Sequence, residues 1–363
     1  SKAMTGSAVV TVNASAVVST SVTPTCIGGS SGTITVSATA GQTPYTYSIN
    51  SGTYQTSNIF TGLAAATYSV AVKTNTGCIS TTTAIVDPFG NSTDDQSATA
   101  TDTWIGHIYK GMNFDNYIGH FTEAETFDEG FGGDYNCFMA SSGALFPTIY
   151  TEQFSVRFKM ASSRKGLYVV DLGSDDGSRL TVDGTMVYNN WVDQSFSTRP
   201  GVLMNLDGGS SLNYEFYENA INNRVIFQNL TRIFGNSLSG NLSQSVCVGT
   251  SGQSIFGDIY GALPAGITKS GSGYQWSYST TPGGPRTNIT GATADSYTPN
   301  TLIAPFNVAG TYYIYRNAIL NSSNNTGVGT YTATNESNPA TLTVNSSSVG
   351  GTLNSNATVC SGA

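Results

Sequence analysis

Strand-type alternation recurs along the chain and restricts its fold more than any other feature. Segments such as 67–72 place apolar and polar side chains at alternate positions, and short runs of Gly, Asn and Ser separate these segments. A period of two with turn residues between segments is typical of half-buried strands. Helix-forming stretches rich in Ala, Leu, Glu and Lys are nearly absent. The sequence therefore predicts an all-β fold and excludes an all-helical or doubly wound α/β enzyme.

The composition indicates a folded, exported protein. Apolar residues make up 39% of the chain, which is too much for a disordered segment. Few lysines, many Thr and Asn residues and widely spaced cysteines are typical of exported proteins. No segment approaches the roughly 20 apolar residues of a membrane span, so we expect no direct membrane insertion. Both ends resemble parts of neighbouring elements, so we expect a segment of a longer protein.

The charges are concentrated in the middle of the chain. Residues 91–235 hold 18 of the 22 acidic and 9 of the 14 basic residues, which leaves 4 acids and 5 bases elsewhere. An acidic module between nearly neutral flanks is therefore expected. No basic stripe is present that could displace counterions from phosphates, so nucleic acid is excluded as a partner.

An internal repeat predicts a tandem array of modules. Residues 11–15 recur as 343–347, and each copy is followed by a Cys-x-Gly motif, at Cys26 and at Cys360. A third such motif begins at Cys247. The predicted parts are the last strand of a preceding module with a linker (1–22), a small β-sandwich (23–88), a linker (89–102), the acidic module (103–235), a second β-sandwich (236–345) and the start of a following module (346–363).

Strand-like segments and one tryptophan indicate where the predicted cores lie. In the acidic module the expected strands are 154–160, 166–172, 179–182, 212–217 and 225–227. In the third segment, Trp276 follows Cys247 at a spacing that suits the core of an immunoglobulin-like sandwich. No nearby later cysteine could pair with Cys247, which departs from the antibody pattern.

Motifs in the first segment carry a resemblance to a known repeat. They are Cys26-x-Gly28, 32–36, 44–49, 60–63, 68–70 and Gly77-Cys78. With these motifs, residues 23–88 resemble the SprB repeat of Bacteroidetes gliding and surface adhesins.

The other two segments also resemble known families. The central motifs are 154–158, 166–168, 173–184 and Asn190-Trp191, and they include the run Asp-Asp-Gly-x-x-Leu-x-x-Asp-Gly. They are similar to the PA-fourteen β-barrel family, which yeast flocculins share. Residues 274–276, 288–293, 296–299 and 310–313 resemble immunoglobulin-like modules of the same adhesins. Together the resemblances imply a type IX-secreted adhesin at the bacterial cell surface, which mediates attachment or gliding and contacts surface glycans or other cells.

Asp175 and Asp176 are the sharpest candidates for chemistry. Adjacent carboxylates repel each other unless a cation lies between them, and hard oxygen ligands suit calcium. In flocculin relatives the matching pair holds calcium, which in turn ligates sugar hydroxyls, so the resemblance assigns this role to Asp175 and Asp176. It also places further ligands in the loop 218–223, where Asn219, Asn222 and Asn223 are candidates.

A purely structural interpretation of the same residues remains open. Asp-Gly pairs flank the expected strand 178–182, and Asp-Gly is a favoured hairpin turn. Trp191 could stack on a sugar or belong to the core.

Five cysteines leave at least one thiol unpaired. A Cys26–Cys78 disulfide would contribute about 3–4 kcal/mol by closing its loop. We expect Cys137 and Cys247 to be small buried hydrophobes, and the absence of CxxC spacing argues against zinc.

Signals for an enzyme are weak. Residues 28–32 fit GxSxG, but no helix pattern follows them. His107 and His120 lie in another module and are expected to be packed or surface imidazoles. Asp128, Glu129 and Asp134 are expected in a glycine-rich loop. We therefore predict a non-enzymatic protein.

Two alternative functions remain. One is a stalk or filament module that self-associates as a homo-oligomer through open sheet edges and binds no ligand. The other is a carbohydrate-binding appendage of a catalytic domain elsewhere in a longer chain.

Overall fold

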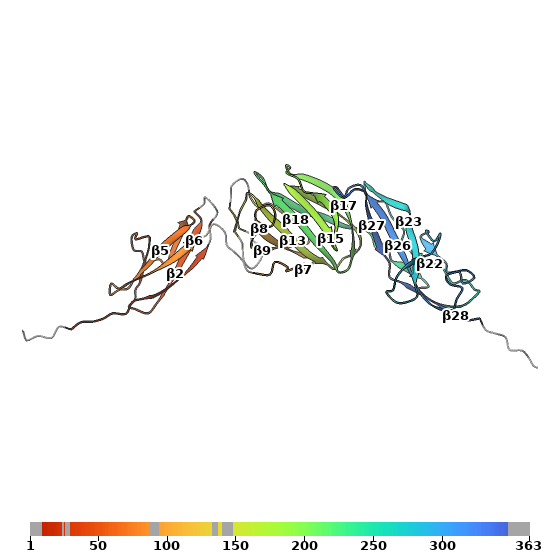
Figure 1. Ribbon diagram of the computed structural model, residues 1–363, viewed down its shortest axis with the longest axis horizontal. Helices are drawn as coiled ribbons and strands as arrows, with labels where there is room; N and C mark the ends of the chain where they lie inside the picture. Colours follow the sequence, from red (N-terminus) through yellow and green to blue (C-terminus); the bar gives the residue numbers. More distant parts are fainter. Residues whose placement is uncertain are drawn as a thin grey trace, which may run out of the picture. The chain divides into compact units, whose positions relative to one another are not determined.

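The chain is built from β-strands, turns and loops (Figure 1). The computed structural model describes residues 9–23, 25, 30–86, 94–132, 137–139 and 148–347. The expected all-β class is confirmed. Nowhere in these ranges does a helix form that is long and apolar enough to cross a membrane. The expected start of a following module at 346–363 falls almost entirely outside the described residues.

The N-terminal sandwich consists of two three-stranded sheets, ordered β1-β2-β4 and β3-β5-β6. Its strands are β1 (Val17–Thr23), β2 (Gly32–Thr39), β3 (Thr46–Ile49), β4 (Ile59–Leu63), β5 (Ala66–Lys73) and β6 (Ile79–Val86). Ile34 and Val36 of β2 and Val70 and Val72 of β5 are fully buried in one cluster. Alternate residues of both sheets thus fill the space between them, as the period of two predicts.

The position of β1 corrects the expected boundary at residue 22. We expected residues 1–22 to end a preceding module. Instead β1 pairs antiparallel with β2 along all seven of its residues, and Ala16, just before it, is buried in the N-terminal core. Val18 and Val22 pack against the same core. The strand belongs to this sandwich because its apolar face completes that core.

The central module contains two main sheets. Its strands are β7 (Ala100–Thr101), β8 (Thr103–Lys110), β9 (Asn116–Ala124), β10 (Phe127–Glu129), β11 (Cys137–Met139), β12 (Thr148–Tyr150), β13 (Phe154–Ser162), β14 (Lys165–Asp175), β15 (Gly177–Val182), β16 (Thr185–Asn190), β17 (Ser197–Asp207), β18 (Ser210–Glu218) and β19 (Arg224–Phe234). One sheet has the order β16-β15-β18-β13-β8-β9, with β7 beside β13, and the other has the order β10-β19-β14-β17. Among the described strands, no pairing joins the two sheets into the closed barrel that we expected.

Aromatic rings fill the space between these two sheets. Trp104 of β8 lies 4.9 Å from Phe227 of β19, measured between ring centroids. Phe127 of β10 lies 4.8 Å from Phe158 of β13. Such ring pairs add roughly 0.5–1.5 kcal/mol each beyond the burial of their area. The predicted strands of this module are confirmed as parts of β13, β14, β15, β18 and β19.

The end of the expected linker joins the central module. β7 pairs in parallel with β13, and the Nζ atom of Lys159 donates a hydrogen bond to the Gln96 carbonyl oxygen (3.0 Å). The predicted linker 89–102 is therefore too long at its C-terminal side, because its last residues are hydrogen-bonded to the sheet.

The C-terminal sandwich consists of β20 (Leu238–Gly240), β21 (Ser243–Cys247), β22 (Ile255–Gly257), β23 (Ile267–Ser279), β24 (Thr287–Asn288), β25 (Ser296–Tyr297), β26 (Gly310–Ser322), β27 (Tyr331–Glu336) and β28 (Ala340–Asn345). Its sheets have the orders β21-β28-β26-β23-β24, with β27 beside β26, and β20-β22-β25. Trp276 is fully buried, and its Nε1 atom donates to the Ala294 carbonyl oxygen (2.9 Å). The predicted core tryptophan is confirmed. Cys247 is exposed, so the expectation of a buried thiol is wrong there.

The chain divides into two compact units at positions that the sequence did not indicate. One unit comprises 1–163, 171–200 and 209–230, and the other comprises 164–170, 201–208 and 231–363. In the second unit, Leu167, Val169 and Leu203 share a buried cluster with Tyr274 and Leu320. The division therefore does not coincide with the predicted boundary at 235/236, because the apolar residues at one end of β14 and β17 are buried with that cluster.

A buried arginine in the C-terminal sandwich makes one glycine essential for packing. Arg316 is fully buried, its Nε atom donates to Asn236 Oδ1 (2.9 Å), and its guanidinium lies 4.6 Å from the Tyr274 ring centroid. A Cβ atom at Gly257 would lie 2.0 Å from Arg316 Nη1, whereas one at Gly261 would meet nothing within 4 Å.

We expect Gly257→Ala to lower the free energy of unfolding by about 2 kcal/mol, because Arg316 must shift away from its hydrogen bonds. Gly261→Ala, in the loop after β22, serves as the matched control and should stay within about 0.5 kcal/mol of wild type. Urea denaturation followed by tryptophan fluorescence measures both. Equal midpoints for the two variants would contradict this packing argument.

Candidate metal centre

The Asp175–Asp176 pair lies where the chain passes from one central sheet to the other. β14 ends at Asp175 in the four-stranded sheet, and β15 begins at Gly177 in the seven-stranded sheet. The peptide bond between the two aspartates is cis. Gly177 is required at this crossing, because a Cβ atom there would lie 2.2 Å from a carbon of the Tyr217 ring.

Strand register brings a third carboxylate to this pair. β15 pairs antiparallel with β18 so that Gly177 faces Tyr217, and β18 ends one residue later at Glu218. One carboxylate oxygen each from Asp175, Asp176 and Glu218 lie within 4.8 Å of one another. The three residues are 7%, 5% and 0% exposed. The sheet therefore holds three acidic groups together away from water.

Backbone amides orient the two aspartates. Asp176 accepts hydrogen bonds from the Gln194 amide at Oδ1 and from the Asn219 amide at Oδ2, both at 2.8 Å. Asp175 Oδ2 accepts one from the Phe196 amide (3.0 Å). Fixed N–H donors favour the ionised carboxylates but bring no full positive charge.

Glu218 has no comparable partner. Among the described residues, neither of its carboxylate oxygens accepts a hydrogen bond of normal geometry. Burial, followed by the charges of Asp176, Asp175 and Glu152, raises the pKa of Glu218 to about 10, and the nearby Ala220 amide opposes this only weakly. The pKa of Asp175 is also raised, chiefly by burial, with the Phe196 amide opposing and Asp176 adding to the rise. A buried carboxylate without a donor or cation is costly to ionise.

The donor set fits a hard divalent cation. Calcium takes six to eight oxygen ligands, mostly carboxylates and carbonyls, and it offsets the mutual repulsion of clustered carboxylates. Asn223 adds a further candidate oxygen from the loop after β18. It is 4% exposed, and its Oδ1 atom has no hydrogen-bond partner in the described part of the chain. Its Nδ2 atom donates to the Thr151 carbonyl oxygen (3.3 Å), which fixes the amide orientation.

The other predicted site residues have different environments. The Asn219 side chain donates from Nδ2 to Asp193 Oδ2 (3.0 Å). Asn222 is exposed. Trp191 is partly exposed, with its ring centroid 4.6 Å from that of Tyr217 and 4.3 Å from the Arg179 guanidinium. Their assignment to ligand binding stays a prediction.

Sequence reasoning missed Glu218 as a member of the cluster. It is the acidic residue that opens the loop 218–223, in which only the asparagines were selected. A carboxylate at the end of a strand that pairs with the Asp-Asp-Gly strand was the available signal. The pairing itself could not be read from the sequence.

The two histidines of the central module are packed, as expected. His107 and His120 face each other across β8 and β9. His107 is fully buried, and its Nε2 atom lies 2.9 Å from the Ala98 carbonyl oxygen. Burial lowers the pKa of His107, against the opposing effect of the Ala98 carbonyl. His120 Nδ1 is hydrogen-bonded to Asp94.

Asp128 and Glu129 lie in β10 and not in the loop that we expected. Asp128 forms a bidentate ion pair with Arg224, with Nε–Oδ1 and Nη2–Oδ2 distances of 2.7 and 2.6 Å. β10 pairs with β19, which brings these two side chains together. Asp134 lies outside the described residues.

The predicted Cys26–Cys78 disulfide stays a prediction, because Cys26 lies outside the described residues. Cys78 has no disulfide partner within the described part of the chain, and its Sγ atom lies 3.6 Å from the Asn13 carbonyl oxygen. Gly28 and Gly29 of the GxSxG match are also outside these residues.

Comparison with known families identifies one repeat. Residues 18–54 match the family model of the SprB repeat. The match begins in β1 and ends between β3 and β4, so the expected resemblance is confirmed over this part of the N-terminal sandwich. It also starts before residue 23, in agreement with the place of β1 in the sheet. No curated protein matches the chain.

Three solved structures show partial similarity to the chain. The PA14 domain of the MpAFP antifreeze protein is 15% identical, covers 38% of this chain and 85% of its own, and has a TM-score of 0.27. A PA14 sugar-binding domain from an RTX adhesin is 19% identical, with coverages of 34% and 87% and a TM-score of 0.25. The A domain of epithelial adhesin 9 from Candida glabrata, in complex with Galb1-4GlcNAc, is 10% identical, with coverages of 39% and 90% and a TM-score of 0.22.

Proposed function

We propose that this chain is a segment of a non-enzymatic adhesin at the bacterial cell surface. Its central module would bind calcium through Asp175, Asp176 and Glu218 and thereby hold hydroxyl groups of a surface glycan. The SprB-repeat match at residues 18–54 supports the adhesin part of this proposal. The flanking sandwiches would act as spacers in attachment or gliding.

The observation that carries the proposal is the buried, unpartnered carboxylate of Glu218 facing two aspartates. If the Asp-Asp-Gly segment served only to shape the chain, there would be no reason to bury a third acidic group that lacks hydrogen-bond donors of normal geometry. Bound calcium would supply coordination positions that sugar hydroxyl oxygens can fill.

Side chains next to the cluster suit contact with a sugar. Trp191 offers a partly exposed ring that the Arg179 guanidinium holds against Tyr217, and Asn222 and Asn219 lie in the adjoining loop. Tyr217 donates from its hydroxyl to Asp193 Oδ1 (2.6 Å), which in turn holds the Asn219 amide. A rigid aromatic face beside amide groups is a common arrangement for recognising polar ligands.

The first test is calcium titration by calorimetry, with wild type, Asp175→Asn, Asp176→Asn and Asp183→Asn. We expect saturable calcium heat in wild type and at least a tenfold weaker affinity in both cluster variants. Asp183 is the matched control because it also precedes a glycine but accepts its hydrogen bond from the Ser211 amide, outside the cluster. Asp183→Asn should bind calcium like wild type.

The second test is binding of the chain to a glycan array in calcium and in chelator. Glycan binding that requires calcium and is lost in Asp176→Asn would support the proposed role of the central module in glycan binding. If calcium titration into wild type gave no heat of binding, the result would contradict the proposal and favour the self-associating stalk. Sedimentation at two protein concentrations would then test for a homo-oligomer.

A further inference from the structure

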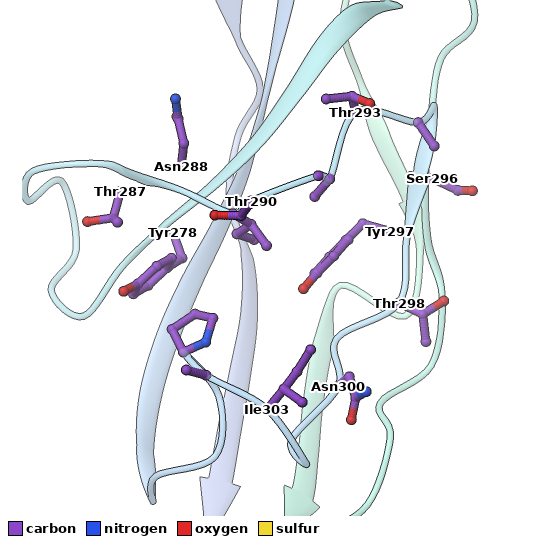
Figure 2. Close-up of a pocket in the computed structure, with 16 residues that line it drawn as sticks. Tyr278, Thr287, Asn288, Thr290, Thr293, Ser296, Tyr297, Thr298, Asn300 and Ile303 are labelled. Atoms are coloured by element: carbon purple, nitrogen blue, oxygen red, sulfur yellow. The ribbon is translucent and has the colours of Figure 1, made fainter.

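The C-terminal sandwich contains a pocket that the proposed calcium site does not use. It lies between the segment 287–294, β25 and the segment 300–305, and it encloses a volume of about 610 Å³ (Figure 2). Ligand pockets typically measure roughly 300–1,000 Å³. β24 and β25 are the end strands of their two sheets, so the pocket occupies the open side of this sandwich.

The chemistry of the pocket lining is polar and neutral. Hydroxyl and amide side chains alternate with apolar ones, and no Asp, Glu, Lys, Arg or His is among the residues that line it. Asn288, Thr290 and Thr293 are exposed, and their side chains form no hydrogen bond within the described chain. These groups can therefore pair with a ligand without breaking a bond of the protein.

The wall that carries these groups is fixed in place. The Ile289 amide donates to the Trp276 carbonyl oxygen, and the Trp276 amide donates to the Ala292 carbonyl oxygen, both at 2.9 Å. Gln275 Nε2 also donates to the Ile289 carbonyl oxygen (3.0 Å). Because the segment is tied to β23 at several points, binding would require little ordering of the wall.

Aromatic and aliphatic surfaces form the opposite side. Tyr297 projects into the space between Thr290 and Ile303 (Figure 2). Its ring centroid lies 5.6 Å from that of the buried Trp276, which supports its position. Burial raises the pKa of Tyr297 to about 12, so its hydroxyl stays protonated and can donate a hydrogen bond. Ile303 is 61% exposed beside it and offers apolar surface to a ligand.

We propose that this pocket binds a neutral oligosaccharide and does so without calcium. Sugars carry hydroxyl groups around the edge of the ring and C–H groups on its faces, which match the free hydroxyls and the Tyr297–Ile303 surface. A charged ligand would find no counter-charge, and a lipid would leave the hydroxyls of the wall unpaired. An extended peptide is disfavoured because β24 and β25 offer only two residues each for strand pairing.

The test uses the full chain on an array of neutral, sialylated and sulfated oligosaccharides in the presence of EDTA. Chelation removes any binding that depends on calcium, which includes binding through the proposed site of the central module, so failure of that site and failure of this pocket are distinguishable. We expect chelator-resistant binding to a subset of neutral oligosaccharides. A Thr290→Val, Thr293→Val double variant keeps the side-chain shapes and should bind that subset about tenfold more weakly.

Thr334→Val is the matched control, since Thr334 is an exposed threonine on β27 outside the pocket. It should bind like wild type, and thermal melts of all variants establish that they fold. Loss of binding only in the double variant would support the proposal. No neutral-glycan binding in EDTA, a preference for charged glycans, or equal binding by all variants would overturn it.

Discussion

We expect Glu218→Gln to abolish the proposed calcium binding and, in chelator at high pH, to make the central module more stable than wild type. Glu218 is fully buried, neither of its carboxylate oxygens accepts a hydrogen bond of normal geometry from the described residues, and burial raises its pKa from 4.5 to about 10. A neutral amide of similar shape removes the cost of ionising this group inside the protein. It also removes a carboxylate ligand, so the same substitution should act in opposite directions on stability and on metal affinity.

The sign of the pH dependence follows from the raised pKa. Between pH 4.5 and about 10 the folded protein holds the proton on Glu218, whereas the unfolded chain releases it. The stability contributed by the protonated group is therefore complete below pH 4.5 and is lost as the pH rises toward 10. Wild type in chelator should melt at progressively lower temperature from pH 5 to pH 9, and Glu218→Gln should show a smaller slope.

Differential scanning calorimetry at these pH values, with EDTA or with calcium, measures both effects. Calcium at about 100 times its dissociation constant should stabilise wild type by about 2.7 kcal/mol and leave Glu218→Gln unchanged. An equal calcium-induced rise in melting temperature in both proteins would remove Glu218 from the metal site. An unchanged pH slope would show that Glu218 is not the titrating group.

Glu215→Gln, three residues earlier on the same strand, should have the opposite effect on stability. Glu215 Oε1 accepts a hydrogen bond from Arg157 Nε (2.6 Å), and Oε2 accepts one from Arg179 Nε (2.5 Å). Burial alone would raise its pKa, but the hydrogen bonds from Arg179 and Arg157 outweigh burial and lower it. A neutral glutamine amide has one acceptor oxygen and no negative charge, so it cannot replace both hydrogen bonds to the arginines. We expect a loss of about 2–3 kcal/mol at pH 7, because two arginines lose the carboxylate between them.

The pH dependence again follows from the direction of the pKa shift. A lowered folded-state pKa means that the stabilisation is complete above the ordinary value of 4.5 and is lost as the pH falls through the folded-state value. Wild type and Glu215→Gln should therefore converge in stability near pH 3 and differ most at pH 6–8. Urea denaturation at pH 3 and pH 7 measures the difference.

Glu336→Gln is the control for this prediction. Glu336 pairs with Arg286 at 2.8 Å, but the Glu336 side chain is 35% exposed whereas that of Glu215 is 8% exposed, so the loss should be at most about 1 kcal/mol. If Glu215→Gln cost no more than Glu336→Gln, the two-arginine bridge would not stabilise the central module. Glu215→Gln should also change the orientation of the Trp191 ring, because Arg179 contacts both Glu215 and that ring.

Much of the local fold could be predicted because strands leave a local signal. The alternation around Phe154, Leu180 and Tyr214 matched real strands, and Trp276 is the buried tryptophan that its surroundings indicated. Errors arose where long-range pairing decided the outcome. Val18 and Val22 have no local signal that separates a preceding module from this one, and only their packing against the N-terminal core assigns β1.

For the candidate site as well, local features could be predicted from the sequence, whereas contacts between distant residues could not. The sequence alone determined an all-β chain, an acidic central segment and the Asp-Asp-Gly motif at Asp175, because composition, alternation and short motifs are local properties. Only the tertiary structure placed Glu218 beside that motif, since the register of β15 against β18 depends on packing between residues distant in the chain. The free hydroxyls facing Tyr297 likewise became a pocket only when two sheets and their loops were brought together. The surroundings then decided the charge states of two glutamates on one strand: hydrogen bonds from Arg179 and Arg157 lower the pKa of Glu215 in spite of its burial, whereas burial raises the pKa of Glu218.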